Sequence, residues 1–377
     1  MFPPRLSEVR RNAAAKMENL YGTTLARLRE ICRNEALPAF AAMQIARWLY
    51  VRRAEGIDAM TDLSRAARQH LSERYEARIM PPLRTSVSAD GTKKYLFGSP
   101  DGGYVETAYI PDGGRATLCV SSQVGCRMGC RFCATGRQGL RRSLSAGKIL
   151  NQIIAIPESP RLTNIVFMGM GEPLDNYDNV LAAIEILTAP WGMAWSPTRI
   201  TLSTAGVTPQ LDRLLRETKV HVAVSLHNPF HDQRAEIMPI ERAYPVRELS
   251  EMLRRHDFSG QRRLSFEYIL MEGLNDTPAH IRELRRLLNG LKCRINIIRV
   301  HRIPGSPYFS PSRQRMEAFR DALTAGGIHT TIRASRGEDI QAACGLLSTA
   351  EAMGKDARDD SAGTRTDDMG GTACTQP

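Results

Sequence analysis

Residues 126–133 read Cys-Arg-Met-Gly-Cys-Arg-Phe-Cys, which places three cysteines within eight positions of the chain. The preceding residues, ATLCVSS at 116–122, are typical of a buried strand, so the cysteines lie on the loop that follows it. Iron–sulfur clusters are usually held by four cysteines. Three cysteines leave one iron open to a small molecule, as a catalytic metal site keeps a vacant position. The alternative is a structural zinc site, which requires four ligands, usually in CxxC pairs.

The CxxxCxxC spacing resembles the core motif of radical SAM enzymes, and Phe132 matches the aromatic residue that is usual before the last cysteine. The resemblance implies a 4Fe-4S cluster held by Cys126, Cys130 and Cys133. It also implies that S-adenosylmethionine (SAM) chelates the open iron through its amino and carboxylate groups.

The composition is that of a basic protein of 377 residues, with a net charge of +11 and 42% hydrophobic residues. Residues 348–377 carry three basic and six acidic side chains, so the rest of the chain has a charge of 11 − (3 − 6) = +14. A basic body suits a polyanionic partner such as RNA. No membrane span or signal peptide is visible, and the use of the eight cysteines indicates a reducing compartment. We therefore expect a cytoplasmic protein with no membrane partner.

The N-terminal third of the chain predicts two accessory parts. Residues 1–85 form a predicted helical domain, because residues 23–34, 38–53 and 62–78 have apolar residues at helical spacing. Residues 1–84 hold 15 basic against 9 acidic side chains, which favours an RNA-contacting domain over a merely solvated helix surface. Residues 86–111 form a predicted β-hairpin linker around the turn Ser-Pro-Asp-Gly-Gly at 99–103.

Residues 112–347 form the predicted core, in which strand and helix patterns alternate from ATLCVSS to HTTIRA at 329–334. This rhythm predicts the α/β class, with a parallel sheet and outer helices. Six strands with crossovers make an incomplete (β/α)6 radical SAM barrel that is open on one side. In such barrels the chemistry lies at the C-terminal ends of the strands. Residues 348–377, rich in Gly, Ser, Thr and Asp, predict a disordered acidic tail.

Small polar residues follow three consecutive predicted strands, a pattern that suits hydroxyl contacts to a bound nucleoside. The first strand end, NIVFMGMGEPL, resembles the GGE-type motif of radical SAM enzymes through Gly169, Gly171 and Glu172. Glycine allows the backbone to approach the SAM ammonium, and Glu172 adds a charge-assisted hydrogen bond to it. An ordinary turn is the alternative there, and an N-cap is the alternative for each serine. The second and third strand ends contribute Ser203, Ser225, Leu226 and His227.

Two further cysteines lie outside the cluster motif. Cys119 precedes the motif by seven residues, and Cys344 lies 225 positions after Cys119, near the end of the predicted core. Neither is needed to hold the cluster. Two buried structural thiols are the alternative interpretation.

From about residue 20 to residue 347 the chain resembles the RlmN/Cfr family of RNA methyltransferases. The matching segments follow one order along the chain and include DGTKKYLF, VETAYIP, TLCVSSQVGCRMGCRFCATG, FMGMGEPLDNYDNV, AVSLHNP, PGSPY and RGEDIQAACG. Within the family the order is closer to RlmN, which methylates carbon 2 of an adenine, than to Cfr, which methylates carbon 8.

The resemblance implies roles for the two extra cysteines. SAM first methylates the Cys344 thiolate, and a second SAM on the cluster yields a 5′-deoxyadenosyl radical that takes hydrogen from the S-methyl group. The resulting methylene radical adds to the adenine, and Cys119 then resolves the thioether, which leaves a transient Cys119–Cys344 disulfide. Glu106, in VETAYIP, matches the family's proposed proton acceptor. A solvent-facing strand carboxylate is the alternative for Glu106.

One position departs from the family pattern. His301 stands where the family usually has an asparagine that contacts the nucleoside of SAM, and histidine lacks the paired amide pattern. The resemblance further implies an RNA substrate (23S rRNA, with tRNA as a second substrate), a flavodoxin-type electron donor and a monomer. The alternatives are Cfr-like methylation at carbon 8 and a non-catalytic RNA-binding protein with a structural metal.

Overall fold

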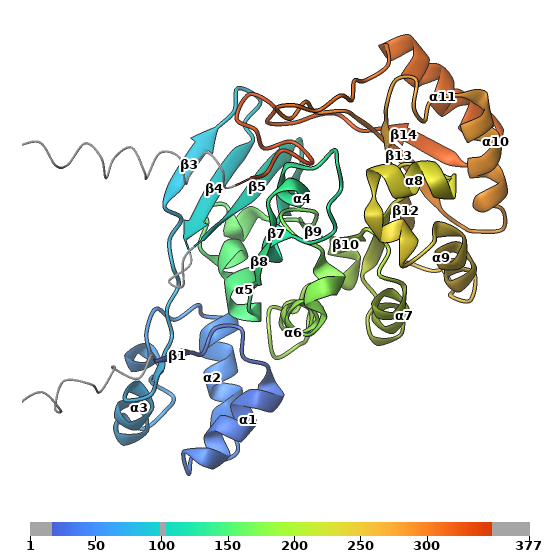
Figure 1. The fold of residues 1–377 in the computed structure, drawn as a ribbon. Helices are drawn as coiled ribbons and strands as arrows, with labels where there is room; N and C mark the ends of the chain where they lie inside the picture. The colour runs from blue at the N-terminus through green and yellow to red at the C-terminus, as the bar shows by residue number, and fades with distance from the viewer. Residues whose placement is uncertain (1–16, 99–102, 349–377) are drawn as a thin grey trace, which may run out of the picture.

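The computed structural model describes residues 17–98 and 103–348. The predicted disordered tail, apart from Ser348, and most of the predicted 99–103 turn lie outside these residues. Within them a ten-stranded sheet has the order β14-β13-β12-β11-β10-β9-β6-β5-β4-β3. Figure 1 shows this sheet curving around an interior, with the helices on its outer side and the N-terminal helices at one end.

Seven strands of the sheet run parallel and form the barrel part: β6 (Arg115–Cys119), β9 (Asn164–Phe167), β10 (Ile200–Thr204), β11 (His221–Ser225), β12 (Leu264–Leu270), β13 (Arg294–Arg299) and β14 (His329–Ile332). The incomplete radical SAM barrel is thus confirmed, but the count of six strands is one short because β14 pairs with β13 at the edge. Continuous apolar sequence explains the central strands, since every residue of β12 is buried.

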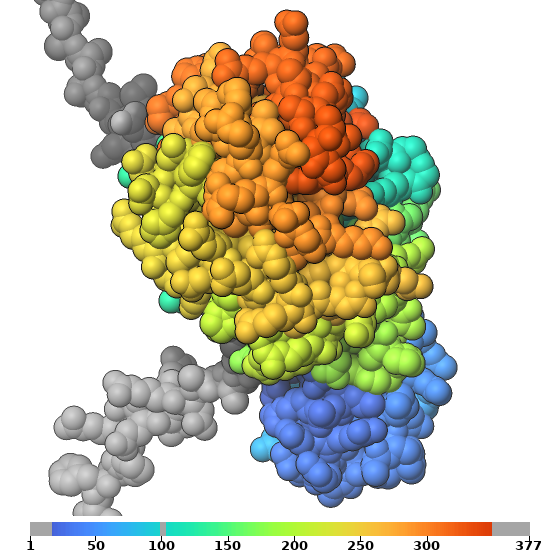
Figure 2. Space-filling view, turned by 90° about the vertical axis from the view of Figure 1, so that its right-hand side faces the viewer, coloured from blue at the N-terminus to red at the C-terminus, as the bar shows by residue number. Residues whose placement is uncertain are grey.

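The helices that connect these strands are α5 (Ala146–Ile154), α6 (Tyr177–Thr188), α7 (Thr208–Glu217), α8 (His231–Ile237), α9 (Val246–Leu253), α10 (Pro278–Leu287) and α11 (Arg313–Ala325), with short 3-10 turns at Ser159–Arg161, Pro173–Asn176, Pro197–Arg199 and Pro239–Arg242. Some of these helices begin at a residue whose side chain caps the helix. Ser145 caps α5 by accepting a hydrogen bond from the backbone of Lys148. Figure 2 shows the outer face, where the later helices cover the barrel and the N-terminal domain lies below.

Three antiparallel strands extend the sheet on the other side of β6: β3 (Arg84–Val87), β4 (Lys93–Gly98) and β5 (Tyr104–Asp112). The predicted hairpin corresponds to β4 and β5. Because β5 also pairs with β6, the hairpin is part of the main sheet and not a free linker. A separate two-stranded ribbon, β7 (Gln123–Cys126) and β8 (Gly139–Ser143), flanks the short helix α4 (Ala134–Arg137).

The N-terminal part is helical, as predicted, with α1 (Leu25–Asn34), α2 (Ala41–Tyr50) and α3 (Arg65–Ser72), a 3-10 turn at Ile57–Ala59 and the strand pair β1 (Glu18–Asn19) and β2 (Tyr75–Glu76). It docks on α5 through two glycines. Gly22 has φ +92°, and a Cβ there would overlap the backbone of Gly147, so any larger residue would push the two parts away from each other.

After β14 the chain returns across the open side of the barrel to the hairpin (Figure 1). We call residues 334–348 the C-terminal strap. Asp339 accepts a hydrogen bond from the Ser88 hydroxyl at 2.6 Å, and Asp90 accepts one from the backbone N–H of Gly337 at 2.9 Å. The strap thereby brings Cys344 to the barrel. Within the described part of the chain, no helix is long and apolar enough to cross a membrane.

Candidate active site

The three motif cysteines come from a tightly built loop. Cys126 ends β7, and Cys133 directly precedes α4. Gly125 has φ +76°, and a Cβ there would overlap the carbonyl oxygen of Gly139, so only glycine fits this crossing of β7 and β8. The Cys133 amide donates to the Cys130 carbonyl at 3.2 Å. The loop is therefore defined by its own sequence as much as by the barrel.

All three cysteines line one cavity, which we call the first cavity. Burial raises the pKa of each thiol, that of Cys126 to about 12, so thiolates in this loop call for a cationic partner such as the irons of a cluster. In the described residues, no three His, Cys, Asp or Glu side chains are arranged around a single metal ion. A four-iron cluster has a different requirement, because each thiolate binds its own iron. The three cysteines on one cavity wall fit such a cluster.

The strand ends opposite the cysteines line the same cavity. They contribute Gly169, Gly171, Glu172, Ser203, Ser225 and His227. Among the residues predicted at these strand ends, the exception is Leu226, whose side chain is fully buried in the core. Leu226 contributes only its backbone, with its N–H donating to the carbonyl of Glu267 at 3.0 Å.

Glu172 is held in the cavity wall by backbone donors. One carboxylate oxygen accepts from the N–H of Ala205 at 2.7 Å and the other from that of Leu174 at 3.1 Å. Burial raises the pKa of Glu172 to about 7. Gly171 has φ +99°, and a Cβ there would lie 2.5 Å from the Cβ of Gln123, so the loop needs glycine. The site can thus present a backbone turn and a titratable carboxylate to an ammonium group.

His227 is neutral and has a defined tautomer. Burial lowers its pKa to about 3, and its Nδ1 accepts from the backbone N–H of Ile269 at 3.0 Å. The proton of the neutral ring is therefore on Nε2. The Phe132 ring lies edge-on to it, with ring centres 4.7 Å apart, which joins the cysteine loop to the third strand end.

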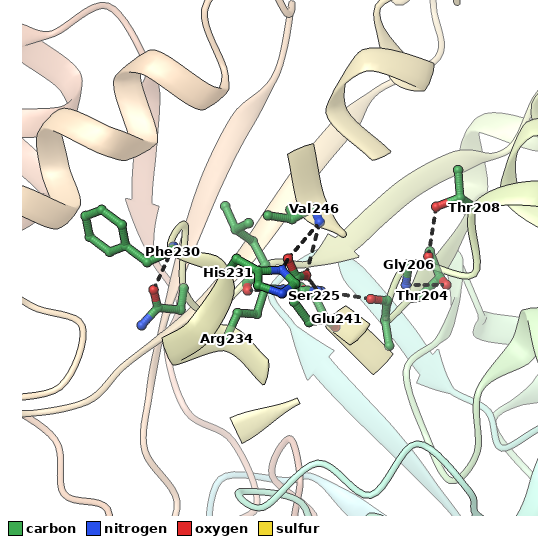
Figure 3. Close-up of polar contacts among 12 residues, drawn as sticks. Thr204, Gly206, Thr208, Ser225, Phe230, His231, Arg234, Glu241 and Val246 are labelled. Atoms are coloured by element: carbon green, nitrogen blue, oxygen red, sulfur yellow. Dashed lines mark hydrogen bonds and ion pairs between the residues drawn. The ribbon is translucent and has the colours of Figure 1, made fainter. Parts of the chain in front are cut away.

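A buried arginine donates hydrogen bonds to two of these strand ends and so holds them together (Figure 3). Arg234, on α8, donates to the carbonyl oxygens of Ala205, Ser225 and Leu226 at 2.8–2.9 Å. Its guanidinium also pairs with the buried carboxylate of Glu241. α8 contacts the cysteine loop as well, because the N–H of Arg131 donates to the carbonyl of Ile237 at 3.0 Å. α8 therefore connects the cysteine loop with the strand ends that carry Ser203 and Ser225.

A second cavity adjoins the first. Cys119, Cys344 and His301 line it together with Arg115, Arg333 and Arg336, and Cys344 and Cys133 line both cavities. The structure thus brings Cys119 and Cys344 to one cavity although 225 positions separate them in the chain. Burial raises the pKa of the Cys119 thiol, and Arg333 counteracts part of this effect. Cys344, by contrast, is exposed. All seven cysteines of the described residues are free thiols.

Glu106 lines neither cavity, as far as the described residues define them. It is buried, so the alternative of a solvent-facing carboxylate is wrong. One oxygen pairs with the Lys94 ammonium at 3.0 Å, and the other accepts from the N–H of Ser348 at 2.9 Å. Burial raises the pKa of Glu106 despite the lysine. In this arrangement Glu106 attaches the end of the strap to β5.

His301 lines the second cavity and not the first. Its Nδ1 lies 3.0 Å from the carbonyl oxygen of Cys344, and its Nε2 lies 2.8 Å from the hydroxyl of Ser335. The imidazole therefore contacts the strap at two points. Both ring nitrogens of His301 are thus engaged by the strap.

The sequence analysis missed several residues of the site. Glu267 and Arg333, 3.5 Å apart, both line the first cavity. Glu267 left a signal, since a carboxylate within the apolar run of β12 requires a partner. Arg234 left no clear signal, because it is one of many arginines in this basic chain.

The comparisons with known proteins agree with this geometry. Residues 120–288 match the radical SAM superfamily, and residues 18–77 match the ribosomal RNA large subunit methyltransferase N-terminal domain. A probable dual-specificity RNA methyltransferase RlmN from Bacteroides fragilis is 54% identical over 88% of this chain and 96% of its own. The dual-specificity RNA methyltransferase RlmN of Syntrophus aciditrophicus is 45% identical over 82% of this chain and 90% of its own.

A solved structure agrees as well. The crystal structure of a radical SAM methyltransferase from Sphaerobacter thermophilus matches with a TM-score of 0.81 and 44% identity, over 88% of this chain and 99% of that one. These matches confirm the resemblance expected from the sequence, on the RlmN side of the RlmN/Cfr family. The chain belongs to the RlmN family of dual-specificity RNA methyltransferases, within the radical SAM superfamily.

Proposed function

We propose that this radical SAM RNA methyltransferase methylates carbon 2 of an adenosine in 23S rRNA, and also in tRNA, through an S-methylcysteine on Cys344. The observation that carries the proposal is the position of Cys344. It lines both cavities, whereas Cys119 lines only the second. A methyl carrier has to meet SAM on one side and the target base on the other, and Cys344 is the cysteine outside the cluster motif that does both.

The first cavity is the proposed SAM site. Cys126, Cys130 and Cys133 would hold a 4Fe-4S cluster, which supplies the one-electron reduction of SAM when it is bound. Among the strand ends, Gly171 and Glu172 would receive the methionine ammonium, since the carboxylate of Glu172 already lies among oriented backbone donors. Ser203, Ser225 and His227 would contact the nucleoside. For His227 the Nε2–H is the group available, because Nδ1 is already an acceptor.

The second cavity is the proposed site of the target adenine. Arg115 and Arg336 line it and would attract the RNA backbone. In the first chemical step the Cys344 thiolate forms a bond to the SAM methyl carbon as the sulfonium–methyl bond breaks, and the thiol proton goes to solvent. In the last step the Cys119 thiolate attacks the sulfur of Cys344. The S–S bond forms as the sulfur–carbon bond breaks, and the released carbon keeps the bonding electron pair and takes up a proton to become the methyl group of the base.

We also propose that Glu106 is the proton acceptor. Its carboxylate is engaged by Lys94 and Ser348, so it would reach the base only if the end of the strap moves. We further propose a cytoplasmic monomer that receives electrons from a flavodoxin-type donor. Residues 1–85 would contact RNA, which the match of residues 18–77 to a ribosomal RNA methyltransferase domain supports. The hairpin (86–111) and the barrel core (112–347) would form the catalytic part.

Two experiments test the proposal. RNA modified by the enzyme is digested to nucleosides, and the methyladenosine isomer is identified by chromatography and mass spectrometry. Only 2-methyladenosine agrees with the proposal, whereas 8-methyladenosine would assign the Cfr-like reaction. In the second experiment Cys119→Ala is compared with Cys344→Ala after anaerobic turnover.

The two cysteine variants should stop at different points. Cys119→Ala keeps the methyl carrier, so it should accumulate protein cross-linked to RNA through Cys344, visible as a gel shift that ribonuclease removes. Cys344→Ala should show neither the cross-link nor S-methylcysteine. A cross-link in the Cys344 variant, or in neither variant, would contradict these roles.

A further inference from the structure

His301 is held between the end of β13 and the C-terminal strap. Its side chain is only 6% exposed. Its Nδ1 lies 3.0 Å from the carbonyl oxygen of Cys344, and its Nε2 lies 2.8 Å from the Ser335 hydroxyl and 3.5 Å from a carboxylate oxygen of Glu338. Both ring nitrogens thus face groups of the strap.

The partners determine which nitrogen donates. A carbonyl oxygen only accepts, so Nδ1 carries a proton and donates to Cys344. In the neutral ring Nε2 then accepts from the Ser335 hydroxyl. Both nitrogens are occupied within the protein, and His301 does not line the first cavity, where the proposed SAM contacts gather. In this arrangement neither ring nitrogen is free to contact the nucleoside of SAM.

The residues that follow Cys344 make hydrogen bonds of their own to another part of the site. The carbonyl of Gly345 accepts from the N–H of Ala134 at 2.8 Å, and the carbonyl of Leu347 accepts from the Thr135 hydroxyl at 2.6 Å. These bonds attach the chain after Cys344 to the helix that follows the cysteine motif. The side-chain bond from His301 is made to Cys344 itself.

We propose that His301 is a positioning residue for Cys344: its Nδ1–H holds the Cys344 carbonyl, and so keeps the thiol where both cavities meet. This rests on the proposed role of Cys344 as methyl carrier. It replaces the expectation that His301 contacts SAM in place of the family's asparagine. It also explains how histidine can occupy that position, since the Nδ2 amide of asparagine lies where the Nδ1 of histidine does.

A matched pair of substitutions separates the two ring nitrogens. His301→Asn retains a donor at the Nδ1 position and loses the contact with Ser335. His301→Gln retains a polar group at the Nε2 position and loses the donor to Cys344. If the Nδ1 bond positions Cys344, the asparagine variant should behave like the wild type and the glutamine variant should not. His301→Ala, which loses both contacts, should resemble the glutamine variant.

Three measurements are made on each variant of the full chain. The first is the rate at which SAM methylates the Cys344 thiol at saturating SAM, followed by mass spectrometry. The second is the SAM dissociation constant of protein with a reconstituted cluster. The third is hydrogen–deuterium exchange of the peptide around Cys344 in protein without the cluster. The third measurement does not depend on activity.

We expect His301→Gln to methylate Cys344 roughly tenfold more slowly, the effect of losing one hydrogen bond of typical net strength, with faster exchange around Cys344. His301→Asn should stay within about threefold of the wild type. The SAM dissociation constant should be unchanged in both. Equal losses in the two variants would overturn the inference, as would weaker SAM binding in His301→Gln with normal methylation of Cys344. If the wild type forms no S-methylcysteine, the proposed function fails, while the exchange data still decide the positioning role.

Discussion

Arg234→Met removes a guanidinium that has no exposed surface while keeping a long apolar side chain. The buried carboxylate of Glu241 then loses its guanidinium partner and keeps only its contacts with the His231 ring and the Val246 N–H. The carbonyls of Ala205, Ser225 and Leu226 lose their donor. Breaking a buried ion pair by removing one partner costs about 3–5 kcal/mol. We therefore expect the free energy of unfolding to fall by about 4 kcal/mol.

The assay is urea unfolding of the full chain, followed by far-ultraviolet circular dichroism. Arg313→Met is the matched control, because Arg313 forms an ion pair with Glu317 at 2.9 Å in which both side chains are exposed. Removing it should cost less than about 0.5 kcal/mol. The double variant Arg234→Met/Glu241→Leu should recover part of the loss, since no unpaired charge remains. The unpaired carbonyls, and the Val246 N–H that loses its acceptor, would keep it below the wild type by about 1–3 kcal/mol.

Two results would refute this reasoning. A loss in Arg234→Met within about 1 kcal/mol of the Arg313→Met loss would mean that the buried site relaxes or admits water, because such a loss lies below the range for broken buried pairs. A double variant as unstable as Arg234→Met would mean that the stranded charge of Glu241 is not the cause.

The remaining predictions concern the first cavity. Replacing Cys126, Cys130 or Cys133 by alanine should abolish the brown colour of the anaerobic protein and its methyl transfer, because two thiolates do not hold a four-iron cluster. Cys293 lies outside both cavities, so Cys293→Ala should keep the colour and the methyl transfer. A full cluster in any of the first three variants would show that the ligand assignment is wrong. The pKa of Glu172 is raised to about 7, so its carboxylate should pair with the SAM ammonium better as pH rises from about 6 to 7.5. The affinity for SAM should therefore increase over this pH range in the wild type but not in Glu172→Gln. A wild-type SAM affinity independent of pH would contradict this prediction. Because the folded pKa of Glu172 exceeds the unfolded one, the folded state binds more protons between about pH 4.5 and 7, and this group's contribution to stability should fall as pH rises through that window.

Much of the fold could be predicted because its signals are local. The strands of the barrel are mostly short segments rich in apolar residues, and the helices between them have apolar residues at helical spacing, so their alternation predicted the parallel sheet. The predicted alternation already ended with the segment of β14, His-Thr-Thr-Ile, so the strand itself was found and only the assignment to a six-stranded barrel was one strand short. The pairing of β5 with β6, which incorporates the hairpin in the main sheet, depends on a contact that no local pattern encodes.

The sequence by itself determined where the cluster thiols lie, because three cysteines within eight residues share one loop in any fold. It also determined that Glu172, Ser203 and Ser225 would meet, since the C-terminal ends of parallel strands share one edge of the sheet. The tertiary structure alone decided the rest of the site. The return of the strap brings Cys344 to the cavity of Cys119.

The same return of the strap decided the partners of Glu106 and His301. The sequence predicted a proton acceptor at Glu106 and a SAM contact at His301. In the structure Glu106 contacts Ser348, and His301 contacts Cys344. The burial of Arg234 was decided in the same way. An arginine on a helix is solvated in most proteins, and only the packing of α8 against two strand ends makes it a buried donor. Such contacts depend on the three-dimensional path of segments far apart in the chain, and therefore no spacing along the sequence reveals them.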